Sequence, residues 1–341
     1  MKLSQMINGS EKFNMGFIGG SITEGGNNGC FIDLIKEKFA LEYPNTQISC
    51  VNAGVGGTGS VLGLFRLERD LMSQNPDIVF IEFAVNDYSL ATTGIYMENL
   101  IRAVKKRNLP VVLVHVASED LLREYEKGDV PANIKKYTEL AEYYNILQLN
   151  IGYDLFKASG MTTDDFMKEN FLDSCHPNGV GYERYADLII KGIENHDFSM
   201  DEIDKPYLFG REISNPNLIM CESFANDKWE LSHCTMYKRL PNYIYSFTPG
   251  DELEFEFDGS FLGLYYTVEK DSGIIEYSID DGELKERSLW DKYAVFFGRA
   301  HFIILEEEIE NGHHKVKIRN SNKRDEKSEG YYARLGAFAI G

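Results

Sequence analysis

The spacing of hydrophobic and polar residues follows two different patterns along this chain, and the change of pattern predicts two domains. Up to about residue 196, short apolar runs rich in Val, Ile and Phe are separated by segments with helical periodicity. The runs have the composition of strands that are buried on both faces of a sheet. The strands predicted in this way span residues 13–18, 47–51, 78–83, 111–116 and 146–149.

Helical segments lie between these strands. They span residues 30–39, 60–73, 96–107 and 132–144, and a last helix is expected after Pro177. In that last segment the apolar residues recur at the spacing of one helical face; they are Tyr182, Tyr185, Ala186, Ile189, Ile190 and Ile193. The alternation of strands and helices predicts an α/β domain, in which βαβ units form a parallel sheet covered on both sides.

The spacing of the apolar residues changes after the polar, acidic stretch 194–205. In residues 252–257 every second residue is apolar, which is the period of a strand with one face in water. The glutamates of this run are therefore expected to face solvent. Leu253, Phe255 and Phe257 are expected to face a core.

Short strands and turn signals continue to the end of the chain. Residues 275–279 alternate in the same way, and Asp280-Asp281-Gly282 after them is a strong hairpin signal. Further strands are expected at 314–318 and 333–340. Many short strands of this kind predict an all-β sandwich or jelly roll. The two domains are expected at residues 1–198 and 206–341.

Composition and charge narrow the possible partners. The 341 residues are 43% apolar and 13% aromatic, which is ample for packed cores. The 54 acidic residues outnumber the 35 basic ones and give a net charge of −19. A surface this negative repels phosphate backbones and anionic membranes, so neither nucleic acid nor a membrane is an expected partner.

The sequence also bears on location and metal content. No apolar run approaches the roughly 20 residues that a membrane-spanning helix needs, and residues 1–10 lack the apolar core of a secretory signal. The five cysteines form no Cys-x-x-Cys pair; they are Cys30, Cys50, Cys175, Cys221 and Cys234. These features predict a cytoplasmic protein with reduced thiols and no bound metal or cofactor, and they leave the oligomeric state open.

Ser21 is the candidate nucleophile. It follows Gly19 and Gly20 at the carboxyl end of the first predicted strand, where open α/β sheets bind ligands. A glycine-flanked serine is also common as a plain turn or helix cap. A serine hydroxyl is a weak nucleophile, so catalysis requires a base within hydrogen-bond reach and a third group to fix that base.

Of the seven histidines, His176 is the best candidate for the general base, because of the residues beside it in the sequence. It lies in Asp173-Ser174-Cys175-His176-Pro177, where the Asp173 carboxylate is close enough in sequence to hold the imidazole. The alternative is a loop histidine that bonds locally before a helix with Pro177 in its first turn. His115 lies inside an apolar strand, and we interpret it as a core residue.

Two segments offer donors for a developing oxyanion, which acyl transfer also requires. In the glycine-rich segment 52–59, Gly54 lets its backbone N–H approach a ligand closely. Asn86, after the third strand, can add a side-chain amide. The glycine-rich segment lacks both the Gly-Lys-Ser/Thr ending of a P-loop and the Gly-x-Gly-x-x-Gly spacing, so nucleotide binding is not favoured.

Together these segments resemble the SGNH (GDSL-type) hydrolases. Four family blocks match in order: Gly20-Ser21-Ile22-Thr23, Asn52-Ala53-Gly54, Asn86-Asp87 and Asp173-Ser174-Cys175-His176-Pro177. The resemblance covers about residues 10–195 and implies a three-layer, flavodoxin-like fold. It also implies that Ser21 is the nucleophile, that His176 is the general base and then the acid, and that Asp173 orients it. The implied oxyanion hole consists of the Ser21 N–H, the Gly54 N–H and the Asn86 amide.

The sequence departs from the family pattern at two positions. Gly20 stands where Gly-Asp-Ser has its aspartate, which leaves the rigidity of the nucleophile loop open. Ala84 stands where a glycine is frequent and is expected to narrow the site slightly.

The second domain resembles the jelly roll that accompanies some carbohydrate esterases of this superfamily. Four aromatic residues there are candidates for stacking on sugar rings; they are Trp290, Tyr293, Tyr331 and Tyr332. The alternative is that they belong to the core or edge of the sandwich, where aromatic residues are common. No segment is long and apolar enough to form a lid over a long acyl chain.

Three functional hypotheses follow. The first is a serine esterase that hydrolyses short-chain acyl esters, above all O-acetyl esters, of carbohydrates or other small substrates. The second is an O-acetyltransferase that uses the same triad. The third is a non-catalytic glycan-binding protein in which the β domain does the binding.

Overall fold

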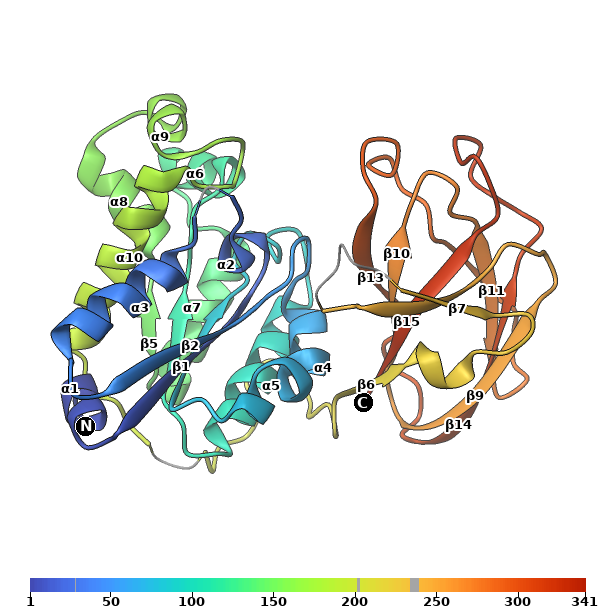
Figure 1. Cartoon of the computed structure of the whole chain (residues 1–341), viewed down its shortest axis with the longest axis horizontal. Coiled ribbons are helices and arrows are strands. Elements are labelled where there is room, and N and C mark those ends of the chain that lie inside the picture. Colours follow the sequence, from blue (N-terminus) through green and yellow to red (C-terminus); the bar gives the residue numbers. More distant parts are fainter. Residues whose placement is uncertain (28, 201–202, 234–238) are drawn as a thin grey trace. The chain divides into compact units, whose positions relative to one another are not determined.

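The structure is a computed structural model that describes residues 1–27, 29–200, 203–233 and 239–341. Cys234 therefore lies outside the described residues. The chain forms two compact units, Met1–Glu212 and Ile213–Gly341 (Figure 1). Within the described ranges, no helix combines the length and the apolar character that crossing a membrane would require.

The first unit is built on a parallel sheet of five strands in the order β2-β1-β3-β4-β5. The strands are β1 (Lys12–Gly19), β2 (Gln47–Gly54), β3 (Ile78–Glu82), β4 (Val111–Val114) and β5 (Leu147–Leu149). This is the order of flavodoxin-like sheets. The predicted α/β fold with a three-layer parallel sheet is confirmed.

Helices cover both faces of this sheet (Figure 1). The helices of the first unit are α1 (Leu3–Asn8), α2 (Ser21–Glu24), α3 (Phe31–Glu42), α4 (Ser60–Asp70), α5 (Thr93–Lys105), α6 (Glu119–Glu126), α7 (Ala132–Tyr144), α8 (Ile151–Ser159), α9 (Thr163–Asn170) and α10 (Gly179–Glu194), with a 3₁₀ turn at Met72–Gln74. Helices α3 and α10 pack together on one face, and α5 packs between α4 and α7 on the other.

Alternate residues of β1 explain how the layers are joined. Phe13, Met15 and Phe17 are buried in one cluster with Ile35 of α3 and Ile189 of α10. Their strand neighbours point to the opposite face because successive side chains alternate across a strand. The apolar run therefore supplies both interfaces, as expected for a strand that is buried on both sides.

The end of the first unit lies later in the chain than the sequence analysis places it. The buried Glu98 carboxylate of α5 accepts the backbone N–H groups of Leu208 (2.6 Å) and Phe209 (2.7 Å). Asn99 donates to the carbonyl of Arg211 at 3.0 Å. These bonds attach residues 208–211 to α5. The first unit therefore ends at Glu212, and the predicted start of the second domain at residue 206 falls inside it.

The second unit consists of antiparallel strands in two sheets. One sheet has the order β13-β10-β15-β8-β7, with β6 also paired to β15, and the other has the order β12-β11-β14-β9. The strands are β6 (Asn217–Met220), β7 (Glu230–His233), β8 (Asn242–Ser246), β9 (Glu252–Gly259), β10 (Leu262–Val268), β11 (Ile274–Ile279), β12 (Lys285–Ser288), β13 (Arg299–Glu306), β14 (Gly312–Asn320) and β15 (Ala333–Ile340), with a 3₁₀ turn at Cys221–Phe224. The predicted all-β character of this region is confirmed.

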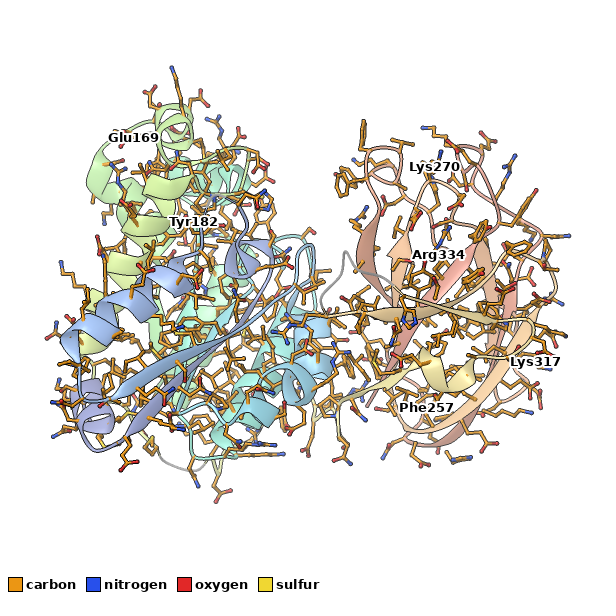
Figure 2. The ribbon with its side chains drawn as sticks, in the orientation of Figure 1. Glu169, Tyr182, Phe257, Lys270, Lys317 and Arg334 are labelled. Carbon is orange, nitrogen blue, oxygen red and sulfur yellow. The ribbon has the colours of Figure 1, made fainter. Side chains whose placement is uncertain are left out.

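Strand β9 shows the alternation that the sequence predicts. Phe255 and Phe257 are buried in the core of the unit, whereas Glu254 faces solvent and pairs with Lys315 and Lys317 of the neighbouring strand β14. Figure 2 labels Phe257 and Lys317 on these two strands. Apolar side chains thus fill one face of the sheet, and ion pairs between exposed side chains cover the other.

The hairpin predicted at Asp280-Asp281-Gly282 joins β11 and β12, which pair in antiparallel fashion. Asp280 and Asp281 both have left-handed backbones, with φ of 53° and 56°. The Gly282 N–H donates to the carbonyl of Ile279 at 2.9 Å and closes the turn. Aspartate tolerates this conformation better than most residues, which is why the signal was readable.

Candidate active site

The turn between β1 and α2 presents Ser21 at the carboxyl end of the sheet. β1 ends at Gly19, and α2 begins at Ser21. A Cβ atom at Gly19 would lie 2.1 Å from the Thr23 hydroxyl oxygen, and one at Gly20 would lie 1.9 Å from the Asn86 side-chain oxygen. Both contacts are far too short for any side chain. The two glycines therefore allow the turn to pack directly against its neighbours.

Ser21, His176 and Asp173 form a continuous chain of hydrogen bonds. The Ser21 hydroxyl oxygen lies 2.8 Å from His176 Nε2. His176 Nδ1 lies 2.8 Å from Asp173 Oδ2. A proton on Nδ1 that is donated to the carboxylate leaves Nε2 as the acceptor for the serine hydroxyl. The structure thus brings together three residues that are separated by up to 155 positions in the sequence.

The Asp173 carboxylate is held in its charged form. Its other oxygen, Oδ1, accepts the backbone N–H groups of Cys175 (2.9 Å) and His176 (2.8 Å). Partial burial raises the pKa of Asp173, but these two N–H bonds and the His176 side chain outweigh it, so the net pKa lies below the usual value. A charged Asp173 can orient the imidazole and stabilise its protonated form.

Asp173, Cys175 and His176 also place three potential metal ligands within 4.8 Å of one another. Burial raises the pKa of the Cys175 thiol to about 12, whereas metals bind the thiolate. Asp173 already occupies His176 Nδ1. This donor set fits a hydrogen-bonded histidine better than a metal centre.

The role predicted for Gly54 in an oxyanion hole does not fit the structure. The Gly54 N–H donates to the side-chain oxygen of Asn52 at 2.9 Å, so this donor is already used within the protein. The Asn52 amide in turn donates to the carbonyls of Thr23 (2.9 Å) and Glu24 (3.2 Å). A Cβ atom at Gly54 would lie 2.2 Å from the Glu24 nitrogen. Glycine is needed here because α2 packs directly against the end of β2.

Gly56, in the same glycine-rich segment, lies beside Ser21. A Cβ atom at Gly56 would lie 3.7 Å from Ser21 Cβ, and the Gly56 N–H is bound to the Glu24 carboxylate at 2.8 Å. Gly57 is exposed and has a left-handed backbone with φ of 70°. Its N–H has no hydrogen-bond partner within the described ranges. The signal in the sequence is the Gly-Gly pair after the strand, which permits such a turn.

Asn86 lies beside the nucleophile turn, with its side-chain oxygen against Gly20. The next residue, Asp87, anchors the Asn86 loop: its carboxylate accepts the Ser60 N–H at 3.0 Å and the Tyr137 hydroxyl. Burial raises the pKa of Asp87 to about 6, against the opposing effect of these bonds. The loop is therefore fixed to the start of α4 and to α7.

Ala84 does not narrow the site, contrary to the sequence-based expectation. Its methyl group is buried in a small cluster with Leu121 and Ile134, away from solvent. Its carbonyl accepts the Asn133 amide at 2.7 Å. The side chain at this position faces α6 and α7, because it lies after the last residue of β3, where the chain has already turned.

Two buried charged residues beneath the site escaped the sequence analysis. Glu82 accepts the Thr23 hydroxyl at 2.9 Å. Arg66 of α4 donates to the Gly19 carbonyl at 2.9 Å. Both residues are buried. Glu82 ends an otherwise apolar strand, and that contrast is the signal that could have identified it; Arg66 pairs with buried Asp70 and lies in a mixed stretch of charged and apolar residues.

The remaining candidates are His115 in the first unit and four aromatic residues in the second. His115 is a core residue, as predicted: burial lowers its pKa to about 3, and its ring stacks on Tyr137. In the second unit, Tyr293 is 49% exposed. The other three aromatic candidates, Trp290, Tyr331 and Tyr332, are half-buried.

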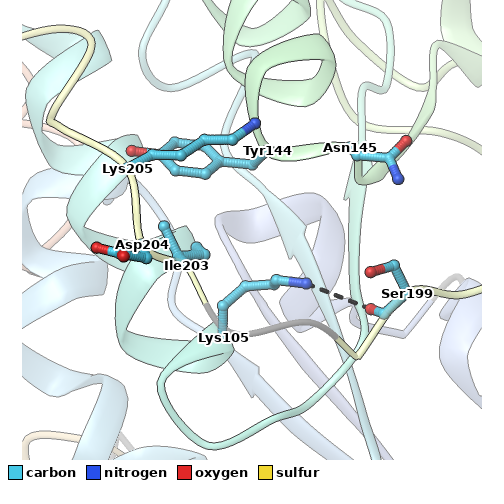
Figure 3. A pocket seen from close by; sticks show the side chains of 7 residues that line it. All are labelled: Lys105, Tyr144, Asn145, Ser199, Ile203, Asp204 and Lys205. Atoms are coloured by element: carbon cyan, nitrogen blue, oxygen red, sulfur yellow. Dashed lines mark hydrogen bonds between the residues drawn. The ribbon is translucent and has the colours of Figure 1, made fainter.

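The first unit also contains a hollow of about 350 Å³ (Figure 3). It includes Lys105 and Tyr144, the last residues of α5 and α7. Helices in βαβ units run antiparallel to the strands, so their carboxyl ends lie at the amino ends of the strands. The hollow is therefore separate from the triad.

Comparison with known proteins agrees with this geometry. Residues 17–184 match the model of the GDSL-like Lipase/Acylhydrolase family, a range that contains Ser21, Asn86, Asp173 and His176. No curated protein matches the chain.

Solved structures resemble the chain over almost its whole length. One is a two-domain esterase (CEX) active on acetylated mannans, with a TM-score of 0.80 and 21% identity over 98% of this chain and 93% of that one. Another is such an esterase co-crystallized with mannopentaose, with a TM-score of 0.79 and 21% identity over 98% and 92% of the two chains. At this identity the likeness shows the fold. Over residues 17–184, just under half of its length, the chain is similar to the GDSL-like Lipase/Acylhydrolase family.

Proposed function

We propose that the chain is a serine esterase that removes short acyl groups, above all acetyl groups, from carbohydrates. The observation that carries this proposal is the hydrogen-bonded chain from Ser21 through His176 to Asp173, with 2.8 Å at each step. The family match supports acyl hydrolysis. The similarly folded esterase that acts on acetylated mannans supports an acetylated carbohydrate as the substrate class.

The triad geometry supports a two-step mechanism. Ser21 Oγ attacks the ester carbonyl carbon while its proton passes to His176 Nε2, and the Asp173 carboxylate stabilises the resulting imidazolium. His176 then gives this proton to the departing sugar oxygen, which leaves an acyl group on Ser21. In the second step His176 takes a proton from water as that water attacks the acyl carbon. Release of the carboxylic acid restores the Ser21 hydroxyl.

The oxyanion that forms in each step needs donors that are not used elsewhere. The Ser21 N–H belongs to the first turn of α2, where backbone N–H groups have no intrahelical acceptor. We assign the second donor to the Asn86 side-chain amide, which lies against Gly20, in place of the occupied Gly54 N–H. Each such donor typically contributes about 10²- to 10³-fold to the rate.

The exposure of the triad fits a substrate that is bulky on the sugar side. The side chains of His176 and Asp173 are 39% and 53% exposed. A long acyl chain needs a deep apolar pocket to bury it, whereas an acetyl ester on a polysaccharide must be reached from the surface. An open triad favours the second kind of substrate.

Hydrolysis of p-nitrophenyl acetate, butyrate and octanoate by the wild type and by Ser21→Ala tests the proposal. We expect acetate to be cleaved fastest and Ser21→Ala to lose about three orders of magnitude or more. Equal rates for the two proteins on every ester would refute the esterase. Acetyl transfer to an added sugar in preference to water would identify an O-acetyltransferase. Glycan binding that is unchanged by Ser21→Ala, without any turnover by the wild type, would identify a binding protein.

A further inference from the structure

Glu82 places a buried carboxyl group directly beneath the nucleophile turn. It is the last residue of β3 and pairs with Gly19, the last residue of β1. Only 2% of the residue is exposed. The four residues before it in the strand are all apolar, so the sheet core itself provides no reason for a carboxyl group at this point.

The Glu82 carboxyl group bonds to the turn that carries Ser21. One of its oxygens, Oε2, accepts the Thr23 hydroxyl at 2.9 Å. Thr23 is itself buried and packs against Gly19. The residue two positions after Ser21 is therefore held by the Glu82 side chain.

The second carboxyl oxygen, Oε1, is buried and has no hydrogen-bond partner within the described ranges. Burial raises the pKa of Glu82 to about 7, against the opposing effect of the bond from Thr23. An unpaired oxygen in such a place costs free energy of folding. A residue retained at this cost is a candidate for a role in function.

A side chain at position 20 could not take over the role of Glu82 in holding the turn. The space over Gly20 is taken by the Asn86 amide, 1.9 Å from where a Cβ atom would lie. Gly20 is also the position at which the aspartate of Gly-Asp-Ser is missing. A bond to the turn can instead come from the end of β3, where Glu82 pairs with Gly19.

We propose that Glu82 is a positioning residue for the nucleophile, which holds Ser21 in line with His176 by accepting the hydrogen bond of the Thr23 hydroxyl. This inference rests on the proposed function of the same site. Glu82 touches neither substrate nor the reacting atoms, and it acts only through the turn. Misplacement of a reacting group by about 1 Å can cost about 100-fold in rate.

The test compares variants at both ends of the bond. Glu82→Leu removes the acceptor, and we expect kcat to fall about 10- to 100-fold with KM within about 2-fold. Glu82→Gln keeps an acceptor oxygen and is expected to retain kcat within about 3-fold. Thr23→Val removes the hydroxyl donor, and its loss should not add to that of Glu82→Leu, because both remove the same bond.

Glu98→Leu is the matched control. Glu98 is also a fully buried glutamate that accepts two backbone N–H groups and one hydroxyl, but from Leu208, Phe209 and Tyr144, remote from Ser21. The Glu98→Leu substitution should lower the melting temperature and leave kcat unchanged. An equal fall of kcat in the Glu82 and Glu98 variants would show a merely structural role and overturn the inference.

A second readout separates this inference from the proposed function. Fluorophosphonate labelling of Ser21, followed by intact mass, measures the reactivity of the nucleophile without any ester substrate. We expect labelling to slow about 10-fold or more in Glu82→Leu and several-fold in Thr23→Val. If Glu82→Leu does not fold, an unchanged labelling rate and kcat in Thr23→Val overturn the inference. A wild type that is labelled but cleaves no ester contradicts the proposed function alone.

Discussion

The two segments joined by the hydrogen bond between Ser21 and His176 are held in opposite ways. The base segment, residues 173–176, is bonded chiefly within itself: Asp173 bonds to the backbone of Cys175 and His176 and to the His176 ring. One bond from α6, from the Glu119 N–H to the Ser174 carbonyl at 2.8 Å, also holds it. The nucleophile turn is held from a distance, by Asn52 of β2 and Glu82 of β3. The base segment is exposed, and the turn is packed against its neighbours without free space.

This difference indicates what each segment tolerates. A locally bonded, exposed loop depends on the charge and hydrogen bonds of a few side chains. A turn packed against three other segments depends on shape, because protein interiors are close-packed and respond to the addition of a single methyl group. Substitutions in the base segment should therefore affect chemistry without stability, and substitutions in the turn should affect both.

The largest effect is expected from Asp173→Asn in the base segment. The substitution removes the charge that stabilises the imidazolium and alters the proton on His176 Nδ1, so kcat should fall about 10³- to 10⁴-fold. The melting temperature should change little, because the side chain is 53% exposed. Ester kinetics combined with thermal unfolding check both parts. A melting temperature that falls with the activity would contradict the local account of this segment.

A smaller loss, about 100-fold in kcat/KM, is expected from Gly20→Ala in the turn. The added methyl group would meet the Asn86 oxygen at 1.9 Å and displace a proposed oxyanion donor. Stability should fall as well. Gly26→Ala is the matched control, since a Cβ atom there meets nothing within 4 Å. Equal activity of the two variants would show that Asn86 is not held against the turn as described.

The smallest effect is a dependence of stability on pH. Burial raises the pKa of Glu82 to about 7, well above the roughly 4.3 of an unfolded glutamate. The folded state thus binds this proton more tightly, so its stabilising contribution is full below about pH 4 and is lost as pH rises through about 7. Glu82→Gln should remove this contribution.

The measurement is the difference in melting temperature between wild type and Glu82→Gln, followed from pH 5 to pH 8. The difference isolates Glu82 because both proteins contain His115. Burial lowers the pKa of His115 to about 3, so this residue destabilises the fold as pH falls, in the opposite sense to Glu82. That contribution cancels when the two melting temperatures are subtracted. Wild type should lose stability relative to Glu82→Gln as pH rises. A constant difference would mean that Glu82 does not hold its proton on burial.

The elements that depend on local pattern were predictable from sequence. Helix α7 has the bounds that periodicity predicts, residues 132–144. The alternation in β9 and the turn at Asp280-Asp281-Gly282 are both as predicted. Helices α6, α8 and α9 were not predicted from the periodicity of the sequence. These short helices gain stability by packing, as Phe156 and Phe166 do against each other, and a short isolated segment has little helical preference of its own.

In the candidate site, residue identities were readable but hydrogen-bond partners were not. The sequence singled out Ser21, Asp173, His176 and Asn86, which the structure places around one turn. It assigned the Gly54 N–H to the oxyanion, because no pattern shows that the Asn52 side chain folds back onto that donor. It passed over Glu82 because an acidic residue at the end of a strand normally faces solvent.

The most direct test of the account is acetate release from acetylated manno-oligosaccharides by the wild type and by Ser21→Ala. The account predicts that the wild type releases acetate and that Ser21→Ala is slower by about three orders of magnitude or more, although it binds the glycan as well as the wild type. Equal acetate release by both proteins would contradict a reaction that passes through Ser21. No release by a correctly folded wild type would contradict the assignment of acetylated carbohydrate as the substrate.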